Sequence, residues 1–439
     1  MTALARALAG LAVLAVVLFG ADKALAVDGR ILDAVSGAPV QDAYVKSAGA
    51  QAQADTSGGF HLAAAGGTLF ARAPGYRATT ISVADLARSA GVIKLTPFTP
   101  KALYLTVYGV GSNSLLGGAM ALVRDGGANA LVVDLKGDRG IVPYPSAEAQ
   151  AANPGARKVT TIPDLAAFAA KMHAQGVYLI ARIVTFKDDP LASAKPELAV
   201  KRDDGRLFRD REGLAWTDPF QADVRAYNIG LAVEAAKAGF DEIQFDYLRF
   251  PDSSAHLRLA QPSNVKTRTA AIAGFLADAR RQLAPYNVYL GADIFGYVCW
   301  NEGDTGIGQA LDAVAPNVDY LSPMLYPSGF QFGIPGVRNP VANSYAIVRQ
   351  SLAEAQARLR VSPKRFRPWL QAFRDYAFDR RQFGAVEVAK QIQAAEDFGS
   401  DGWMLWNANN VYSGAGLATR APGPRADVSA SPSSQASCS

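Results

Sequence analysis

The stretch that decides the fold runs from residue 222 to residue 252 and reads ADVRAYNIGLAVEAAKAGFDEIQFDYLRFPD. Its first part, 222–238, has the composition of a helix, and Gly239 stands where a left-handed residue would end that helix. The second part, 242–250, is an apolar run rich in residues that favour strands. A helix, a glycine and a strand therefore follow one another within one short unit.

This unit recurs along the body of the chain. We predict eight strands, at 103–108, 130–135, 178–186, 242–250, 288–295, 319–326, 367–373 and 402–406. Helical segments lie between them, with clear examples at 164–175, 222–238, 265–283, 341–359 and 385–398. Alternation of this kind predicts a parallel sheet, and eight units in about 310 residues are typical of a (β/α)8 TIM barrel. The alternative, an open doubly wound sheet, is disfavoured because no G-x-G-x-x-G follows the first strand.

The body, 99–415, is flanked by regions of different composition. In 27–98, short alternating segments are separated by turn signals such as DTSGG (55–59), which predicts a small all-β sandwich. The run from VDGRILDAVSGAPV to FARAPGYR resembles the carboxypeptidase-regulatory-like family, a transthyretin-like sandwich found as an accessory domain in secreted enzymes. The last segment, 416–439, is rich in Ala, Pro and Ser, and we expect it to be disordered.

The first segment, 1–26, has the parts of a secretory signal peptide. A basic residue, Arg6, precedes an apolar run over 8–20, and Ala-Leu-Ala at 24–26 supplies a cleavage site. We expect cleavage after Ala26 and a periplasmic or extracellular location. The alternative, an uncleaved membrane anchor, needs about 20 apolar residues, and this run is shorter. No later stretch is apolar enough to span, so we expect no stable membrane span after cleavage.

The composition argues against several kinds of function. A net charge of +5 over 439 residues, with no run of Lys and Arg, gives no reason to expect a nucleic-acid partner. The three histidines, His61, His173 and His256, form no metal-binding cluster, so we expect neither a metal nor another cofactor. The two cysteines, Cys299 and Cys438, lack metal-ligand spacing, and a disulfide between them is left open, as is the oligomeric state.

Acidic residues stand near the carboxyl ends of the predicted strands, where TIM barrels hold their active sites. Asp246 lies in the strand at 242–250, and Asp293 lies in the next strand, within GADIFG. An aspartate inside an apolar strand is costly to bury without a partner, which favours a function for both. Glycoside hydrolysis needs two carboxyl groups, one as proton donor and one as nucleophile or base. We therefore predict a catalytic pair of Asp246 and Asp293, with Glu302 and Asp304 as further candidates for the proton donor.

Other polar and aromatic residues at the strand ends are candidates for binding a sugar substrate. They are Asp134, Lys136, Arg182, Arg249, Tyr326, Gln371, Trp406 and Asn407. Several have a structural alternative. Asp134 would cap the next helix, the arginines would pair with the acids, and Trp406 would fill the core.

Five motifs are spread over the body: NALVVDLKGDRG, YLIARIVTFKDDPLA, DEIQFDYLRFPD, DYLSPMLYPSGF and DGWMLWNANNVYS. Over residues 100–412 they resemble a bacterial family described as "Putative glycosyl hydrolase domain". The resemblance implies a TIM-barrel hydrolase of the α-amylase type. In that type the aspartate of strand four is the nucleophile, and strand five supplies the general acid, usually a glutamate. This chain matches the first at Asp246 and has Asp293 at the second.

Two functions fit these observations. The first is a secreted glycoside hydrolase that acts on a polysaccharide. The second is a non-catalytic carbohydrate-binding or cell-envelope protein on a hydrolase-like barrel, which the aspartate in place of the usual glutamate favours. A metal-dependent hydrolase would need a cluster of His and Asp ligands, and the scarcity of histidine argues against it.

Overall fold

The computed structural model describes residues 25–47, 50–253 and 256–417, which form two compact units. One unit holds the described residues up to Arg72 together with Thr79–Leu95, and the other holds Ala73–Ala78 together with the described residues from Thr96 onward. The predicted signal peptide, apart from its last two residues, lies outside the described residues. So do Cys438 and the predicted tail beyond residue 417.

The N-terminal unit is built of two sheets, with strand orders β4-β1-β7 and β3-β2-β5-β6. The strands are β1 (Leu25–Asp33), β2 (Tyr44–Ser47), β3 (Ala50–Gln53), β4 (Gly59–Ala65), β5 (Thr68–Arg72), β6 (Thr79–Ser82) and β7 (Val92–Leu95). Ile31 of the first sheet and Val45 and Leu69 of the second are fully buried. The predicted all-β region is therefore present, and it also carries one short helix, α1 (Val83–Arg88), that the sequence did not predict.

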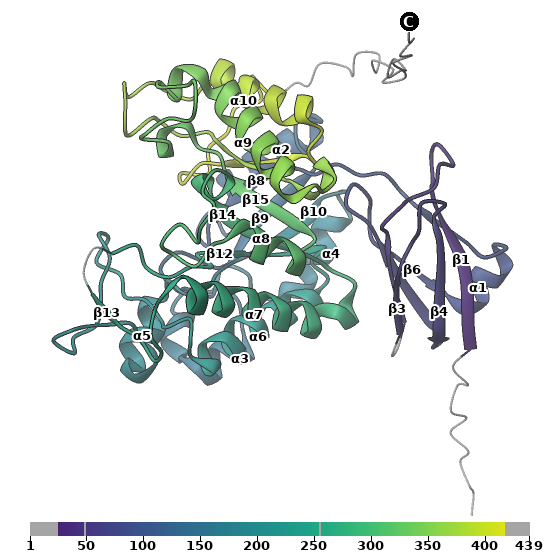
Figure 1. Ribbon diagram of the computed structural model, residues 1–439, viewed down its shortest axis with the longest axis horizontal. Helices are drawn as coiled ribbons and strands as arrows, with labels where there is room; N and C mark the ends of the chain where they lie inside the picture. Colours follow the sequence, from purple (N-terminus) through teal and green to yellow (C-terminus); the bar gives the residue numbers. More distant parts are fainter. Residues whose placement is uncertain (1–24, 48–49, 254–255, 418–439) are drawn as a thin grey trace, which may run out of the picture. The chain divides into compact units, whose positions relative to one another are not determined.

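The second unit is a closed barrel of eight parallel strands, which confirms the predicted (β/α)8 fold (Figure 1). The strands are β8 (Lys101–Leu105), β9 (Ala130–Lys136), β10 (Tyr178–Val184), β12 (Glu242–Asp246), β14 (Tyr289–Phe295), β15 (Tyr320–Met324), β16 (Trp369–Gln371) and β17 (Trp403–Trp406). They pair in sequence order, and β17 closes the barrel by pairing with β8. A separate two-stranded pair joins β11 (Lys201–Arg202) to β13 (Leu257–Arg258).

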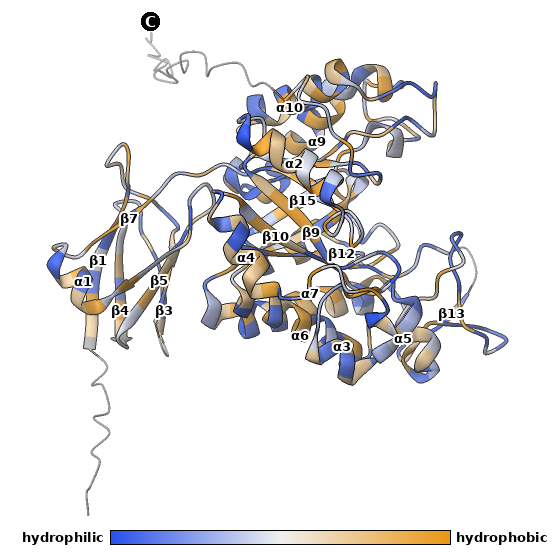
Figure 2. Ribbon diagram, turned by 180° about the vertical axis from the view of Figure 1, so that it is seen from behind, coloured by the Kyte–Doolittle hydropathy of each residue, from blue (hydrophilic) through white to orange (hydrophobic). Residues whose placement is uncertain are grey.

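Helices follow the strands and cover the outside of the barrel (Figure 1). They are α2 (Asn113–Arg124), α3 (Ala147–Ala152), α4 (Leu165–His173), α5 (Asp189–Ala194), α6 (Ala222–Ala238), α7 (Val265–Leu283), α8 (Leu311–Val314), α9 (Ser344–Leu359) and α10 (Ala385–Phe398). Gly239 ends α6 as predicted, with a φ of 99°, and Gly399 ends α10 in the same way, with a φ of 88°. Figure 2 shows the strands as mainly hydrophobic, whereas the helices carry both kinds of residue.

Two hydrophobic clusters flank the barrel wall. The inner cluster fills the barrel with residues such as Tyr104, Ile180 and Trp369. The outer cluster lies between strands and helices and includes Ile183 of β10. Because side chains alternate along a strand, the polar residues on the inward positions of the carboxyl ends face the barrel mouth.

The opposite, amino-terminal end of the barrel is closed by its own buried ion pairs. Arg367 bonds to the Glu242 carboxylate, and its Nη2 donates to Asp401 Oδ2 at 3.0 Å. Tyr289 adds hydrogen bonds from its hydroxyl to the carbonyls of Ala73 and Tyr76, both at 2.8 Å. This end is therefore sealed, and the carboxyl end is left for a ligand.

Strand β12 ends four residues earlier than predicted. The prediction ran to Phe250, but Tyr247 takes a φ of 47°, which an extended strand does not allow. Left-handed backbone at a bulky residue stores strain and is found most often at functional sites. Here it turns the chain directly after Asp246 and ends the strand on that residue.

The described residues contain no helix that could serve as a membrane span. They also contain no group of three or more His, Cys, Asp or Glu side chains arranged to hold a metal ion.

Candidate active site

A cleft of about 500 Å³ lies among the strand ends and loops at the carboxyl end of the barrel. Its lining consists of Arg182, Glu212, Asp246, Tyr247, Arg249, Phe295, Gln309, Met324, Tyr326, Phe373, Tyr376, Trp406 and Ala408. Four of these residues, Arg182, Asp246, Tyr326 and Trp406, lie at or directly after the ends of β10, β12, β15 and β17. The cleft therefore has the position that barrel enzymes use for their substrates.

Arg182 forms the centre of an ion network at the floor of the cleft. Its Nη1 donates to Asp134 Oδ1 at 2.6 Å, and its Nη2 donates to Asp138 Oδ1 at 2.8 Å. Both its Nε and its Nη2 donate to Asp246 Oδ2, at 2.9 and 2.6 Å. The guanidinium also lies over the Trp406 ring, 4.7 Å from its centroid. One fully buried cation thus holds three carboxyl groups in place.

Asp134 belongs to this network rather than to the lining of the cleft. Its Oδ2 accepts a hydrogen bond from the Tyr104 hydroxyl at 2.7 Å. Burial raises the pKa of Asp134 to about 7, although the nearby Arg182 favours the charged form. Its role is to position Arg182, and the structure shows no helix-capping role for it.

Asp246 is the network carboxylate that reaches the cleft, with 6% of its side chain exposed. One of its oxygens is taken up by Arg182, and its Oδ1 accepts the backbone N–H of Tyr247 at 2.5 Å. The short hydrogen bonds fix the carboxylate in a single orientation at the wall of the cleft.

Asp293 lies on the strand next to Asp246, since β12 and β14 pair in parallel up to Phe245 and Ala292. It is fully buried, and its Oδ1 accepts the indole N–H of Trp369 at 2.8 Å. Its Oδ2 is buried and has no hydrogen-bond partner among the described residues. Burial, reinforced by the negative Asp246, raises the pKa of Asp293 well above its ordinary value. Burial therefore favours the protonated form of Asp293.

Two aromatic residues complete the central part of the cleft. Tyr326 packs edge-on against Phe373, with ring centroids 5.5 Å apart. Burial and the negative charge of Asp246 raise the pKa of Tyr326 far above its usual value, so its hydroxyl keeps its proton and can donate a hydrogen bond. Trp406 stacks on Tyr104 at 3.9 Å, and its own edge reaches the cleft.

Arg249 lines one wall of the cleft and lies over Trp216, 4.8 Å from the ring centroid. Burial lowers its pKa, and its Nη1 donates to the carbonyl of Phe250 at 3.1 Å. The predicted pairing of this arginine with Asp246 is not a direct ion pair in the described residues. Its guanidinium instead rests on aromatic rings beside the substrate space.

Lys136 does not face the cleft. The pairing of β9 with β10 shifts register after Arg182, so that Asp134 opposes Arg182 but Lys136 opposes Ile183. An extra residue in one strand turns the following side chains to the other face. Lys136 therefore points outward, where its Nζ meets Asp188 at 2.6 Å and Asn228 of α6 at 2.8 Å.

The remaining predicted residues hold loops rather than line the cleft. Gln371 is buried, and its amide bonds to the hydroxyl and backbone of Ser328. Asn407 donates to the carbonyls of Ala372 and Val411. Asp304 pairs with Arg268 and ties its own loop. Asp304 and Glu302 are both absent from the residues that line the cleft.

Glu212 is a cleft carboxylate that the sequence did not predict as a site residue. It lies in the long connection between β10 and α6, its side chain is 63% exposed, and its Oε2 is 3.0 Å from Lys187 Nζ. Gln309, also unpredicted, donates to the carbonyls of Leu248 and Asp293 at 3.2 Å. Both arrive on loops whose path no strand periodicity reveals.

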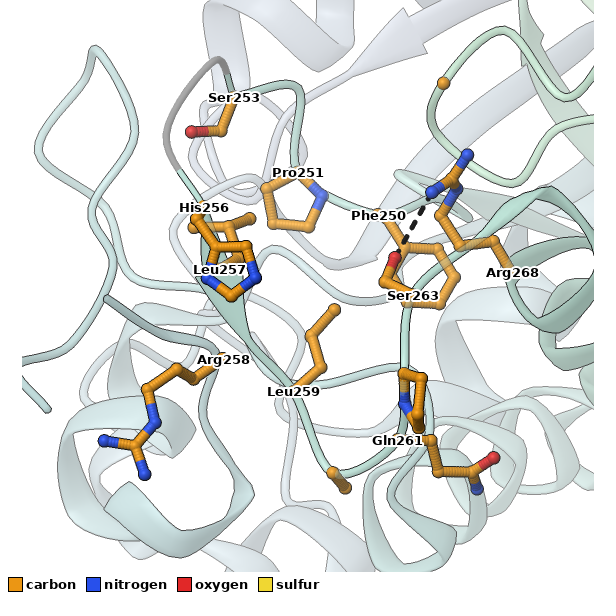
Figure 3. A pocket seen from close by; sticks show the side chains of 13 residues that line it. Phe250, Pro251, Ser253, His256, Leu257, Arg258, Leu259, Gln261, Ser263 and Arg268 are labelled. Atoms are coloured by element: carbon orange, nitrogen blue, oxygen red, sulfur yellow. Dashed lines mark hydrogen bonds between the residues drawn. The ribbon is translucent and has the colours of Figure 1, made fainter. Parts of the chain in front are cut away.

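A second hollow, of about 540 Å³, is lined mainly by residues of 250–253 and 256–263, before α7 (Figure 3). Apolar Pro251 and Leu259 point into it, and Arg268 and Ser263 bond to each other at its edge. None of the described residues that line it carries a carboxyl group. This hollow therefore offers no carboxyl group for acid chemistry, unlike the cleft around Asp246.

The raised pKa of Asp293 has a measurable consequence. The folded protein binds this proton more tightly than the unfolded chain, which loses it above about pH 4, so the free energy of unfolding falls as the pH rises above about 4, by up to about 1.4 kcal/mol per pH unit. Asp293→Asn resembles the protonated group and should remove this part of the pH dependence. Urea unfolding from pH 4 to pH 8 measures it, and parallel curves for the two proteins would contradict the assignment.

Comparison with known proteins agrees with the fold. The model of a family described as "Putative glycosyl hydrolase domain" matches residues 102–412, which cover the barrel. A hypothetical protein from Ruminiclostridium thermocellum ATCC 27405 is 39% identical, over 44% of this chain and 96% of that one, with a TM-score of 0.38. A search of curated proteins found no match.

Solved structures extend the comparison. The glycoside hydrolase domain of PgaB (BpsB) from Bordetella bronchiseptica has a TM-score of 0.52 at 15% identity, over 71% of this chain and 95% of that one. This likeness shows the barrel fold. A chitinase from Chromobacterium violaceum ATCC 12472 has a TM-score of 0.42 at 14% identity, over 73% of this chain and 100% of that one.

Proposed function

We propose that this chain, which belongs to the family described as "Putative glycosyl hydrolase domain", is an exported glycoside hydrolase that cleaves a polysaccharide in the cleft. The observation that carries the proposal is the contrast between two neighbouring carboxyl groups. Asp246 accepts hydrogen bonds from Arg182 at the wall of the cleft, whereas Asp293 is fully buried and burial raises its pKa. Where two carboxyl groups have such different surroundings, one serves as the base or nucleophile and the other as the general acid.

The division of roles follows from these contacts. Asp246 attacks the anomeric carbon or activates a water molecule, and Arg182 holds its Oδ2 in place. Asp293 supplies the proton that the leaving oxygen needs, and its unpaired Oδ2 is the atom that would carry it. The Tyr326 hydroxyl and the Arg249 guanidinium are placed to bind sugar hydroxyls. Two carboxyl groups in these roles are what glycoside hydrolysis requires.

Glu212 is the alternative proton donor. It lines the cleft, whereas Asp293 lies behind the lining, but its side chain stands largely in water beside Lys187. The two candidates are separated by the pH dependence of kcat/KM. Loss of the high-pH limb in Asp293→Asn, with the limb retained in Glu212→Gln, supports Asp293, and the reverse result assigns the role to Glu212.

A second function, carbohydrate binding without catalysis, is favoured by the complete burial of Asp293. The two functions differ in one experiment. Purified protein is incubated with a panel of neutral, amino and acidic polysaccharides, and new reducing ends and oligosaccharide masses are measured. Products from any polymer support hydrolysis. Binding of a polymer by calorimetry, with no products, supports the second function.

Export is part of the proposal and rests on the character of residues 1–26. Strand β1 begins at Leu25, so cleavage after Ala26 would leave nearly the whole strand intact. We expect the mature protein, recovered from the periplasm or the medium, to begin at Val27. N-terminal sequencing checks this, and a protein that keeps Met1 and sediments with membranes would instead be anchored.

A further inference from the structure

A row of aromatic rings leads away from the cleft along the carboxyl end of β14. Phe295, the last residue of β14, lines the cleft and is 40% exposed. Its ring centroid is 5.9 Å from that of Tyr297, which in turn is 6.4 Å from that of Phe332. Neighbouring rings are tilted by 56° and 44°, so they do not stack face to face and do not cover each other.

Phe332 is the outermost ring and is 92% exposed. The Tyr297 hydroxyl holds the loop that carries it, because this hydroxyl accepts the backbone N–H of Phe332 at 3.0 Å and donates to the carbonyl of Gly333 at 3.1 Å. A further backbone bond joins the Gly333 N–H to the Phe330 carbonyl at 2.8 Å. The loop is thus tied on both sides of an apolar side chain that it presents to water.

Exposing a large ring on a fixed loop forgoes the hydrophobic free energy that burial would supply. A ring left exposed in this way therefore points to a ligand. The position of the ring indicates the kind of ligand, because the row starts at Phe295 in the wall of the substrate cleft. The spacing of the rings is about the length of one pyranose unit, and aromatic faces bind the apolar faces of sugars.

We propose that Phe295 and Phe332 form a binding track for the polysaccharide chain beyond the cleavage point, with Tyr297 as the residue that positions the outer ring. The track rests on the proposed function, since it continues the cleft of that site. It also specifies the substrate, which is a long polymer that binds the protein both in the cleft and outside it. Short oligosaccharides fill the cleft alone and do not reach Phe332.

The test compares Phe332→Ala with the wild type by affinity electrophoresis in gels that contain hydroxyethyl cellulose, glycol chitosan, xylan or polygalacturonate. We expect the variant to bind the retarding polymer about 5- to 10-fold more weakly, which is the size of one lost aromatic contact. Phe332→Tyr should restore binding. The control is Val386→Ala, which shortens another exposed apolar side chain, 61% exposed and located on α10, and should leave binding unchanged.

Kinetics on the same polymers separate the track from the catalytic proposal. For Phe332→Ala we expect a raised KM on polymers, with an unchanged kcat and unchanged turnover of trisaccharides. Equal retardation of Phe332→Ala and wild type overturns the track but not hydrolysis. If retardation depends on Phe332 but no products form, the binding track is supported and the proposed hydrolysis is overturned. If no polymer retards the wild type, both are overturned.

Discussion

Asp246→Asn should lower kcat by at least about 10³-fold on any polysaccharide that the protein hydrolyses. The amide keeps the shape of the carboxylate but can neither attack the anomeric carbon nor accept a proton. One of its atoms would still face Arg182, whose other partners, Asp134 and Asp138, remain. The variant should therefore fold, and circular dichroism with a thermal melt would show it.

The matched control for this change is Asp223→Asn. Asp223 is exposed in the first turn of α6, so the same chemical change there should leave kcat and KM as they are. Initial rates of reducing-end release are measured for the three proteins under identical conditions. A folded Asp246→Asn variant that retains wild-type turnover would remove Asp246 from the reaction.

Arg182→Met should destabilise the protein by about 3–5 kcal/mol, the usual effect of removing one partner from a buried ion pair. Arg182 is fully buried, and its loss leaves Asp134 and Asp246 without their shared cation. The loss should shrink at low pH, because protonated carboxyl groups no longer need a positive partner. Urea unfolding at pH 7 and pH 4 measures both effects.

An exposed ion pair serves as the control for this prediction. Arg206→Met breaks the pair with Asp204, in which both side chains stand in water, and should not change stability measurably. Arg182→Lys should fall between the two, because an ammonium keeps the charge but cannot bridge three carboxyl groups at once. Equal stability of Arg182→Met and wild type would show that the network is not required for the fold.

The barrel was predictable because its signals are local and repeated. Helices α6, α7 and α10 have the predicted bounds, since a glycine ends α6 and α10 and a 3-10 turn that contains a proline, Ala284–Tyr286, follows α7. The end of β12 was not predictable, because the left-handed turn at Tyr247 follows from contacts around Asp246 rather than from its own preference. Local sequence pattern thus predicts the order of the helices and strands, whereas tertiary contacts determine the residues at which they end.

The site was predictable only where strand register is regular. Asp246 and Arg182 lie on inward positions and meet, as alternation along adjacent strands requires. Lys136 follows one extra residue in β9, which no sequence rule marks, and so it faces α6. Glu212 reaches the cleft on a long loop, where sequence separation says nothing about distance. Asp293 is hydrogen-bonded to Trp369, which lies 76 positions away in the sequence, so its surroundings could not be predicted from local pattern.

Cleavage of glycosidic bonds in the cleft around Asp246 is tested most directly by the release of reducing ends from the polysaccharide panel. The wild type and Asp246→Asn are measured side by side, with product masses from both. We expect at least one polymer to yield oligosaccharides with the wild type and none with the variant. A polymer that the wild type binds without releasing any product, or that both proteins cleave at the same rate, would contradict this expectation.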